Sequence, residues 1–195
     1  MFCNLTPRFG RDYWVGDVFY TRKPLGFISD GIAMDTYRDM VEAGELVASH
    51  TGVVVSETHV IEAEPPVVRR WPLSEYVRDT MTLLWIKRPL GQTQASAEAM
   101  GRFAAGLRDQ PYDGSNIVGL LFSDDDDKGQ EPNPLADAGE WICSRLVDLA
   151  LRATEGLRTV PLPAAFKRVH PTWRTPQGLN GAPIWEPGIS GPPPA

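Results

Sequence analysis

The sequence of 195 residues is poor in the residues from which disulfide frameworks and metal sites are built. It has only two cysteines, Cys3 and Cys143, and three histidines, and none of these shows a metal-ligand spacing. Two cysteines cannot form a disulfide framework. Each is therefore expected to be a free thiol, either a small buried hydrophobe or a nucleophile. No metal and no cofactor are expected.

Other absences narrow the function classes. No apolar run approaches the ~20 residues that a membrane-spanning helix needs, and no glycine-rich nucleotide-binding signature occurs. The N-terminal stretch MFCNLTPRFGRDYW lacks the basic, apolar and small-residue zones of a signal peptide, so we expect a chain made in the cytoplasm. A formal net charge of -6 argues against a nucleic acid or an anionic membrane as partner.

The chain does have enough apolar residues for a hydrophobic core, with 42% of hydrophobic type. Its 18 prolines are uneven, since nine of them follow residue 160. We therefore expect a folded domain at 1–160 and a Pro-rich C-terminal extension at 161–195. In the extension, short helical turns should precede a polyproline-like tail. Either Trp173 and Trp185 anchor the extension to the body or to a partner, or the extension is partly loose.

Hydrophobic periodicity and turn residues predict a fold in which helices and strands do not alternate strictly. That order argues for an α+β fold around a mainly antiparallel sheet. The acidic run at 124–127 lacks the glycine and the terminal glutamate of a calcium loop, and is interpreted as solvated. Strands are predicted at 17–22, at 50–55 and 59–63 as a hairpin, and at 80–87; helices are predicted at 36–46, 94–107, 116–122 and 141–153; and an acidic loop is predicted at 123–140.

Cys143 lies in the first turn of the last predicted helix of the core. Unpaired backbone N–H groups at a helix start lower the pKa of a thiol and can donate to an oxyanion. Helical spacing places Leu146, Val147 and Ala150 on the same face as Cys143. Cys143 is thus either a nucleophile at the end of a packed helix or a plain packing residue.

His50 and Glu62 lie on the two strands of the predicted hairpin. A carboxylate among apolar neighbours needs a partner, because burying an unpaired charge is costly. A loop with an odd number of residues places both side chains on one face, where they touch directly or diagonally; a two-residue loop places them on opposite faces. Glu64 has the parity of Glu62 and is the alternative partner. A lone His at a strand end can also have no further role.

Cysteine at a helix start, with histidine and glutamate on paired strands, is the set of nucleophile, base and orienting group used by cysteine hydrolases. Six short segments also occur in a particular order: GDVFYTR, SHTGVVV, VIEA, PLSEYV, QPYD and CSRLV, at 16–22, 49–55, 60–63, 72–77, 110–113 and 143–147. This order resembles the circularly permuted branch of the NlpC-type papain-like fold, the group related to lecithin:retinol acyltransferase. The resemblance covers about residues 14–155.

The resemblance implies a permuted papain-like fold in which an antiparallel sheet packs against the helix that carries the cysteine. It makes Cys143 the nucleophile, His50 the general base and Glu62 the group that orients the imidazole, and it places Tyr20 or Tyr112 near the oxyanion. Two departures stand out. Arg145 replaces the usual glutamate of the CSRLV segment. The insertion at 123–139 places an acidic, proline-broken loop before the nucleophile, where it would be a lid or a docking surface.

The function expected from these features is thiol-dependent hydrolysis of acyl bonds, with peptidoglycan peptide amides as the substrate that the resemblance implies. Arginine outnumbers lysine 15 to 4, which suggests a GC-rich bacterial or bacteriophage genome. A wall hydrolase without a signal peptide fits a bacteriophage tail or lysis protein or a secreted effector, placed in a virion or delivered to the cell wall. Two alternatives stay open: a lipid or thioester acyl hydrolase or acyltransferase, and a non-catalytic adaptor that binds a protein partner through its Pro/Trp-rich tail.

Overall fold

The computed structural model of the chain describes residues 7–22, 47–79, 81–116, 120, 130–137, 139–187 and 193–194. Several sequence predictions fall outside these residues: the helix at 36–46, most of the helix at 116–122, the acidic run at 124–127, Cys3, and most of the tail after residue 187.

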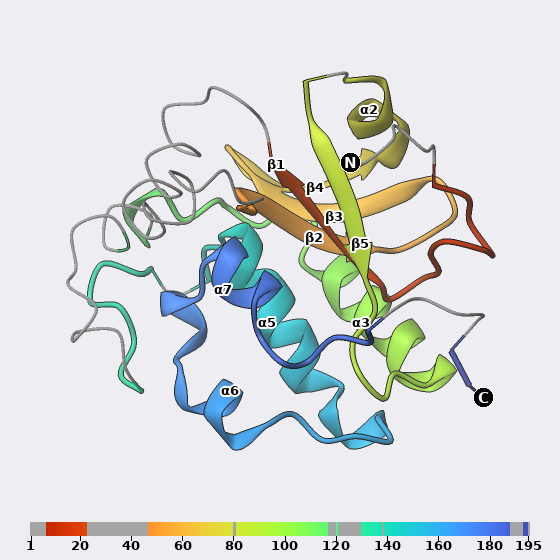
Figure 1. The fold of residues 1–195 in the computed structure, drawn as a ribbon. Helices are drawn as coiled ribbons and strands as arrows, with labels where there is room; N and C mark the ends of the chain where they lie inside the picture. The colour runs from red at the N-terminus through yellow and green to blue at the C-terminus, as the bar shows by residue number, and fades with distance from the viewer. Residues whose placement is uncertain are drawn as a thin grey trace.

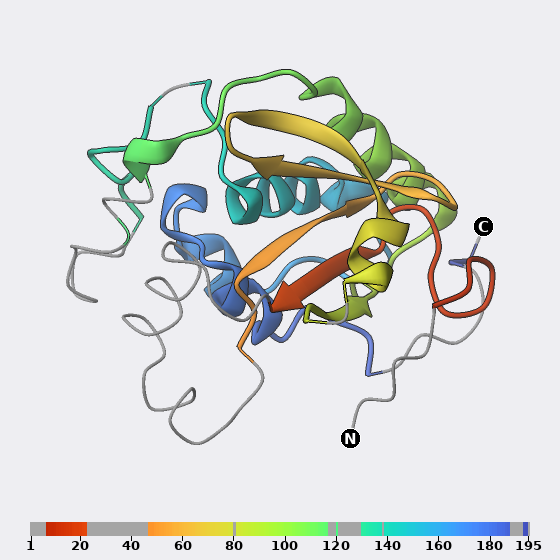
Figure 2. The same ribbon diagram turned by 90° about the horizontal axis from the view of Figure 1, so that it is seen from above.

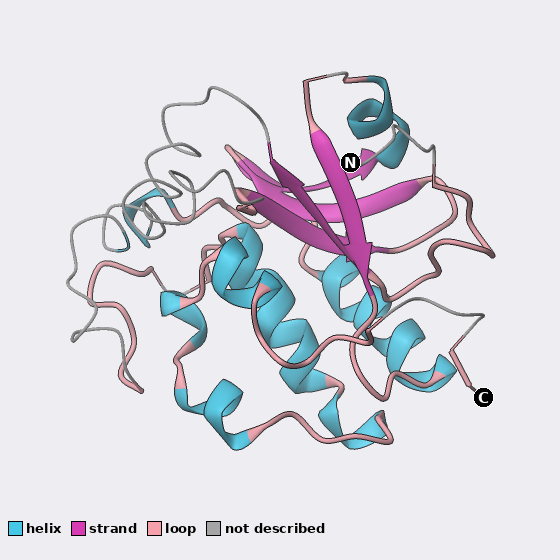
Figure 3. Ribbon diagram, in the orientation of Figure 1, coloured by secondary structure: helices cyan, strands magenta, loops and turns pink. Residues whose placement is uncertain are grey.

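A five-stranded antiparallel sheet, in the order β4-β3-β2-β1-β5, forms the centre of the fold (Figures 1 and 3). Together with the helices around it, the sheet confirms the predicted α+β class and the mainly antiparallel pairing. The strands are β1 (Val18–Arg22), β2 (His50–Val54), β3 (His59–Glu64), β4 (Val67–Pro72) and β5 (Leu83–Lys87).

The two faces of the sheet are covered differently, as alternate side chains of a strand point to opposite faces. On one face, Val18, Val53 and Ile61 share a core cluster with residues of α3 (Gln94–Gly106) and α5 (Cys143–Ala153). On the other face, Phe19, Val54 and Val60 pack with Leu73 and Tyr76 of the short helix α2 (Leu73–Arg78). Figure 1 shows α3 and α5 below the sheet and α2 above it; Figure 2 gives the same layers from above.

Helix α3 follows the sequence pattern closely. Thr93 caps its first turn with a capping box, and Ala97, Met100 and Ala104 bury the predicted face. The helix ends at Gly106, one residue before the predicted end. Among the described residues, no helix combines the length and the apolar character that a bilayer crossing requires.

Some elements begin later than predicted, and two were not predicted at all. Strand β5 begins at Leu83 rather than at residue 80. Helix α5 begins at Cys143 rather than at 141, because the backbone of Trp141 pairs with Tyr112 instead of entering the helix. Strand β4 and helix α2 were not predicted as elements. The adjacent arginines of β4 interrupt the period-two pattern, and this edge strand is specified by its pairing with β3.

The segment that follows residue 160 packs against the body as far as residue 187. It consists of α6 (Ala164–Arg168), the 3-10 turn η3 (Pro171–Trp173) and α7 (Pro176–Asn180), which follow the 3-10 turn η2 (Glu155–Leu157). Its apolar residues Leu162, Phe166, Leu179 and Ile184 belong to the same core cluster as the sheet. The domain boundary at 160 stays a prediction from composition, but the residues on its two sides share one core.

Both tryptophans of this segment contact the body. The indole N–H of Trp173 donates to the backbone carbonyl of Glu131 at 2.8 Å, and Trp173 is buried. Trp185 packs edge-on against Tyr20 of β1, with ring centroids 5.7 Å apart. Of the predicted alternatives, the described residues 161–187 have the one in which this segment is anchored to the body.

Candidate active site

His50 and Glu62 come together on one face of the β2–β3 hairpin. The last paired residues of the hairpin are Val54 and Val60, which leaves an odd number of residues between them. As the odd-loop alternative predicts, the two side chains share a face, and His50 Nε2 lies 3.0 Å from Glu62 Oε2. The ring of His50 also packs against the rings of Phe19 and Tyr76. These contacts hold the imidazole in one orientation.

Glu62 is completely buried, yet it is ionised. Burial alone would raise its pKa, but hydrogen bonds and charge from His50, Tyr76 and Arg69 lower the pKa of Glu62 to about 2. Arg69 donates to Oε1 at 2.8 Å, and the Tyr76 hydroxyl donates to Oε2. A buried carboxylate with partners on both oxygens is a stable anion that can orient and stabilise an imidazolium.

Arg69 and Tyr76 are the two residues of this site to which the sequence analysis gave no role. Arg69 lies directly opposite Glu62 in the β3–β4 ladder, so opposite charges face each other across paired strands. Prediction of β4 as a partner of β3 would have revealed this pair. Tyr76 lies within the PLSEYV segment, and its place on α2 brings the hydroxyl over the sheet.

Cys143 is the first residue of α5, a free thiol that is 7% exposed. Its sulfur interacts with His50 through a hydrogen bond and through charge. Since Nε2 of His50 is engaged by Glu62, Nδ1 is the nitrogen left to exchange a proton with the thiol. Burial lowers the pKa of His50, but Cys143 and Glu62 together raise it well above its ordinary value. This environment favours a proton on His50.

Glu64 reaches the other side of the imidazole. Its Oε2 lies 3.6 Å from His50 Nδ1, and its side chain is 29% exposed. Glu62 makes the shorter contact and is fully buried, so Glu62 is the carboxylate that fixes the ring. Glu64 instead places a second negative charge near His50 Nδ1, the nitrogen that Glu62 leaves free.

Tyr20 and Tyr112, both predicted near the oxyanion, differ in their exposure at this site. The backbone of the PYD turn runs beside the residues that precede α5, with Asp113 N–H donating to the Trp141 carbonyl at 3.0 Å. This pairing brings Tyr112 next to Cys143, and burial followed by the charge of Cys143 raises the pKa of Tyr112. Tyr112 is partly exposed, whereas Tyr20 is completely buried beside Trp85. Only Tyr112 of the pair is therefore open to a bound molecule.

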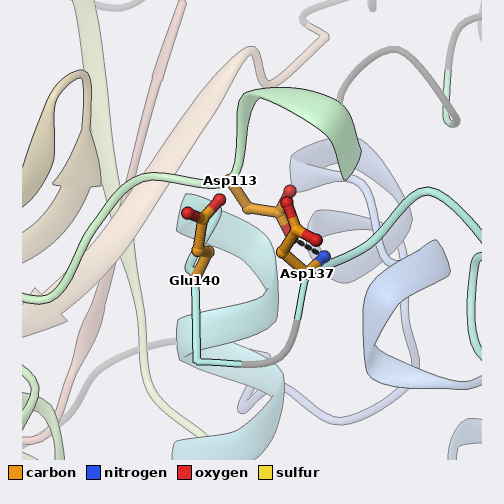
Figure 4. A group of neighbouring side chains, drawn as sticks. All are labelled: Asp113, Asp137 and Glu140. Atoms are coloured by element: carbon orange, nitrogen blue, oxygen red, sulfur yellow. Dashed lines mark hydrogen bonds between the residues drawn. The ribbon is translucent and has the colours of Figure 1, made fainter.

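Three carboxylates converge just before the start of α5, those of Asp113, Asp137 and Glu140 (Figure 4). One carboxylate oxygen of each lies within 4.8 Å of the others, and carboxylate oxygens are the ligands that hard cations prefer. Here Arg145 supplies a positive charge from within the protein: its Nη1 lies 3.5 Å from Asp113 Oδ2 and donates to the carbonyls of Asp137 and Glu140 at 3.1 and 2.8 Å. Arg145, the departure from the resembled motif, thus ties Asp137 and Glu140 to the helix that carries Cys143.

No protein-family model matches this chain, and no curated protein sequence matches it either. A function for the site therefore depends on its geometry and on the resemblance of the short segments.

Proposed function

We propose that this chain is a thiol-dependent hydrolase of acyl bonds, with Cys143 as nucleophile, His50 as general base and Glu62 as the orienting carboxylate. The observation that carries the proposal is the buried His50, engaged by Glu62 at Nε2 and by the Cys143 thiol. A nucleophile, a base in reach of it and a third group that orients the base are the parts that acyl transfer needs.

The steps follow from these positions. His50 Nδ1 takes the thiol proton, and the Cys143 sulfur attacks the substrate carbonyl carbon to form a tetrahedral intermediate. Backbone N–H groups at the start of α5, which have no partner within the helix, stabilise the oxyanion. His50 then gives its proton to the leaving amine. Water, deprotonated by His50, attacks the thioester; the acid product leaves and the thiol is restored.

The substrate class comes from the resemblance. We propose that the domain is a circularly permuted papain-like domain of NlpC type and that the bond cleaved is an amide of a peptidoglycan peptide. In that setting, the chain would act at the cell wall as part of a bacteriophage tail or lysis system. Lipid or thioester acyl transfer by the same thiol is separable by substrate, since it predicts turnover of p-nitrophenyl esters and none of muropeptides.

The first test is the rate at which iodoacetamide alkylates Cys143, measured in a Cys3→Ser background so that one thiol reports. Alkylation should stay fast at about pH 6, where an ordinary thiol with a pKa of about 8.5 is almost wholly protonated. His50→Ala should slow it about tenfold or more, because the thiolate loses its imidazolium partner. His59→Ala is the matched control, because His59 bonds Thr58 and has no contact with Cys143 in the described part of the chain.

A rate that follows an ordinary thiol and does not respond to His50→Ala would overturn the proposal. A fast, His50-dependent rate would be followed by muropeptide cleavage, with Cys143→Ala as the inactive control. An adaptor that only binds a partner predicts slow alkylation and no turnover.

A further inference from the structure

A hollow lies near the end of α5 opposite to Cys143. It has a volume of about 380 Å³ and lies between α6 and the turn that leads into η3. Arg152, which lines it, comes nine positions after Cys143, about 13 Å further along the helix axis. The hollow is therefore separate from the candidate active site. The residues that line it are Gln130, Arg152, Ala164, Lys167, Arg168, His170 and Pro171.

The charge of this lining is of one sign. Three of its residues are arginine or lysine and none carries a carboxylate, in a chain with a net charge of -6. Arg152 is committed to the fold, since it bonds Asp148 and donates to the carbonyls of α6 and Val169. Lys167 pairs with Glu155 at 2.8 Å. Arg168 is exposed and has neither an ion pair nor a side-chain hydrogen bond within the described part of the chain.

His170 adds a donor to the same hollow. Its Nδ1 accepts the backbone N–H of Thr172 at 3.3 Å and lies 2.8 Å from the Thr172 hydroxyl oxygen. The ring proton of the neutral imidazole is therefore on Nε2. Among the described residues, nothing accepts a hydrogen bond from this N–H. Burial and the charges of Arg145 and Arg152 lower the pKa of His170, while Asp148 and Glu131 act in the opposite direction.

We infer that this hollow is a binding site for a small oxyanion, the phosphate or carboxylate group of a ligand, held by Arg168, His170 Nε2–H and Lys167. A guanidinium and an N–H without acceptors, next to an ammonium, are the donors that such anions select. A positive lining on a negative protein also concentrates anions locally. The inference is independent of the proposed hydrolase activity.

The test follows the three histidine side chains of the full chain by NMR while inorganic phosphate is added at constant ionic strength, and acetate in a parallel series. The His170 resonances should shift and saturate, and those of His50 and His59 should not. The bound anion should raise the pKa of His170 by about one unit, the size expected from an opposite charge a few ångströms away. Tighter binding of phosphate would indicate a phosphoryl ligand, and tighter binding of acetate a carboxylate ligand.

Arg168→Ala should weaken the binding about tenfold, because one charge-assisted hydrogen bond is lost. The matched control is Arg78→Ala, an exposed arginine on α2 that pairs with Glu75. Equal shifts of all three histidines, no saturation, or the same loss in both variants would overturn the inference. Arg168 is exposed, so its replacement does not disturb the core.

Discussion

His50 and Glu62 form their 3.0 Å contact as diagonal, not opposite, neighbours of the β2–β3 hairpin. Continuing the register of Val53 with Ile61 places Gly52 opposite Glu62 and Glu64 opposite His50. The residue opposite Glu62 thus has no side chain, and the ring of Phe19, which packs against the imidazole of His50, lies in the space that a Cβ at position 52 would take. Glycine at position 52 is therefore part of the site as well as of the sheet.

Gly52→Ala should disrupt this arrangement. A Cβ on residue 52 would lie 2.5 Å from Cε1 of Phe19 and closer still to the carbonyl oxygen of Ile61, which is backbone and cannot move aside. We expect a loss of about 1–3 kcal/mol in the free energy of unfolding, measured with urea, and slower alkylation of Cys143. Gly106→Ala is the control, since a Cβ there meets nothing within 4 Å; equal effects of the two substitutions would contradict the role of Gly52.

Tyr76→Phe should weaken the hold on Glu62. The variant keeps the ring but removes a hydroxyl that donates to a buried carboxylate, which costs about 1–3 kcal/mol for a hydrogen bond to a charged group. The pKa of Glu62 should rise above about 2. As the pH is lowered, the Cys143 alkylation rate should therefore begin to fall at a higher pH than in the wild type. Tyr13→Phe is the control: it removes a hydroxyl that donates to the backbone carbonyl of Glu57, and it should leave the fall of the alkylation rate at low pH unchanged.

Stability should depend on pH through Glu62. Its pKa is lower in the folded chain, about 2 against 4.5, so the charged form stabilises the fold above about pH 4.5 and this contribution is lost as the pH falls toward 2. The difference corresponds to about 3 kcal/mol. Urea unfolding of Glu62→Gln should lack this part of the acid slope. An unchanged slope would show that Glu62 is not held as an anion. If Glu62→Gln does not fold, the pH dependence of unfolding is measured for Tyr76→Phe instead, where a smaller change in the acid slope is expected.

Arg145→Glu restores the residue type of the resembled motif, and here it should be harmful. Asp113 is completely buried and faces the Arg145 guanidinium, so the substitution places a second negative charge beside it. We expect a loss of about 3 kcal/mol or more in the free energy of unfolding, with a smaller loss for Arg145→Gln. Arg102→Glu, at an exposed position of α3, is the control. A stable Arg145→Glu variant would contradict the pairing with Asp113.

Removal of residues 161–195 should prevent stable folding. The cut takes five buried hydrophobic side chains, Trp173 among them, and leaves Asp148, which is completely buried, without the guanidinium of Arg174 at 2.9 Å. Circular dichroism and limited proteolysis should report an unfolded or protease-sensitive chain. Removal of residues 188–195 keeps these contacts and should leave a cooperative unfolding transition; two folded products would mean that the segment after 160 is dispensable.

The sequence by itself determined the features that depend on neighbouring residues along the chain. The period-two pattern of β2 and β3 and the helical spacing of α3 are local, so the hairpin and the helix were predicted nearly to their ends. The residue types also made Cys143, His50 and Glu62 candidates, because a carboxylate among apolar neighbours needs a partner and a cysteine at a helix start can be a nucleophile; their catalytic roles stay predictions.

The tertiary structure decided what depends on residues far apart in the chain. From the sequence, the hairpin loop could have an odd or an even number of residues, so His50 and Glu62 could lie on the same face or on opposite faces. The register in the folded sheet places them on the same face. The partners that keep Glu62 ionised come from β4 and α2, an edge strand and a short helix without a clear local pattern. The segment after residue 160 looked like an extension by composition, yet Leu179 and Ile184 are core residues. In each case the deciding free energy comes from burying side chains against residues that are far away in the sequence, and local sequence patterns do not encode those contacts.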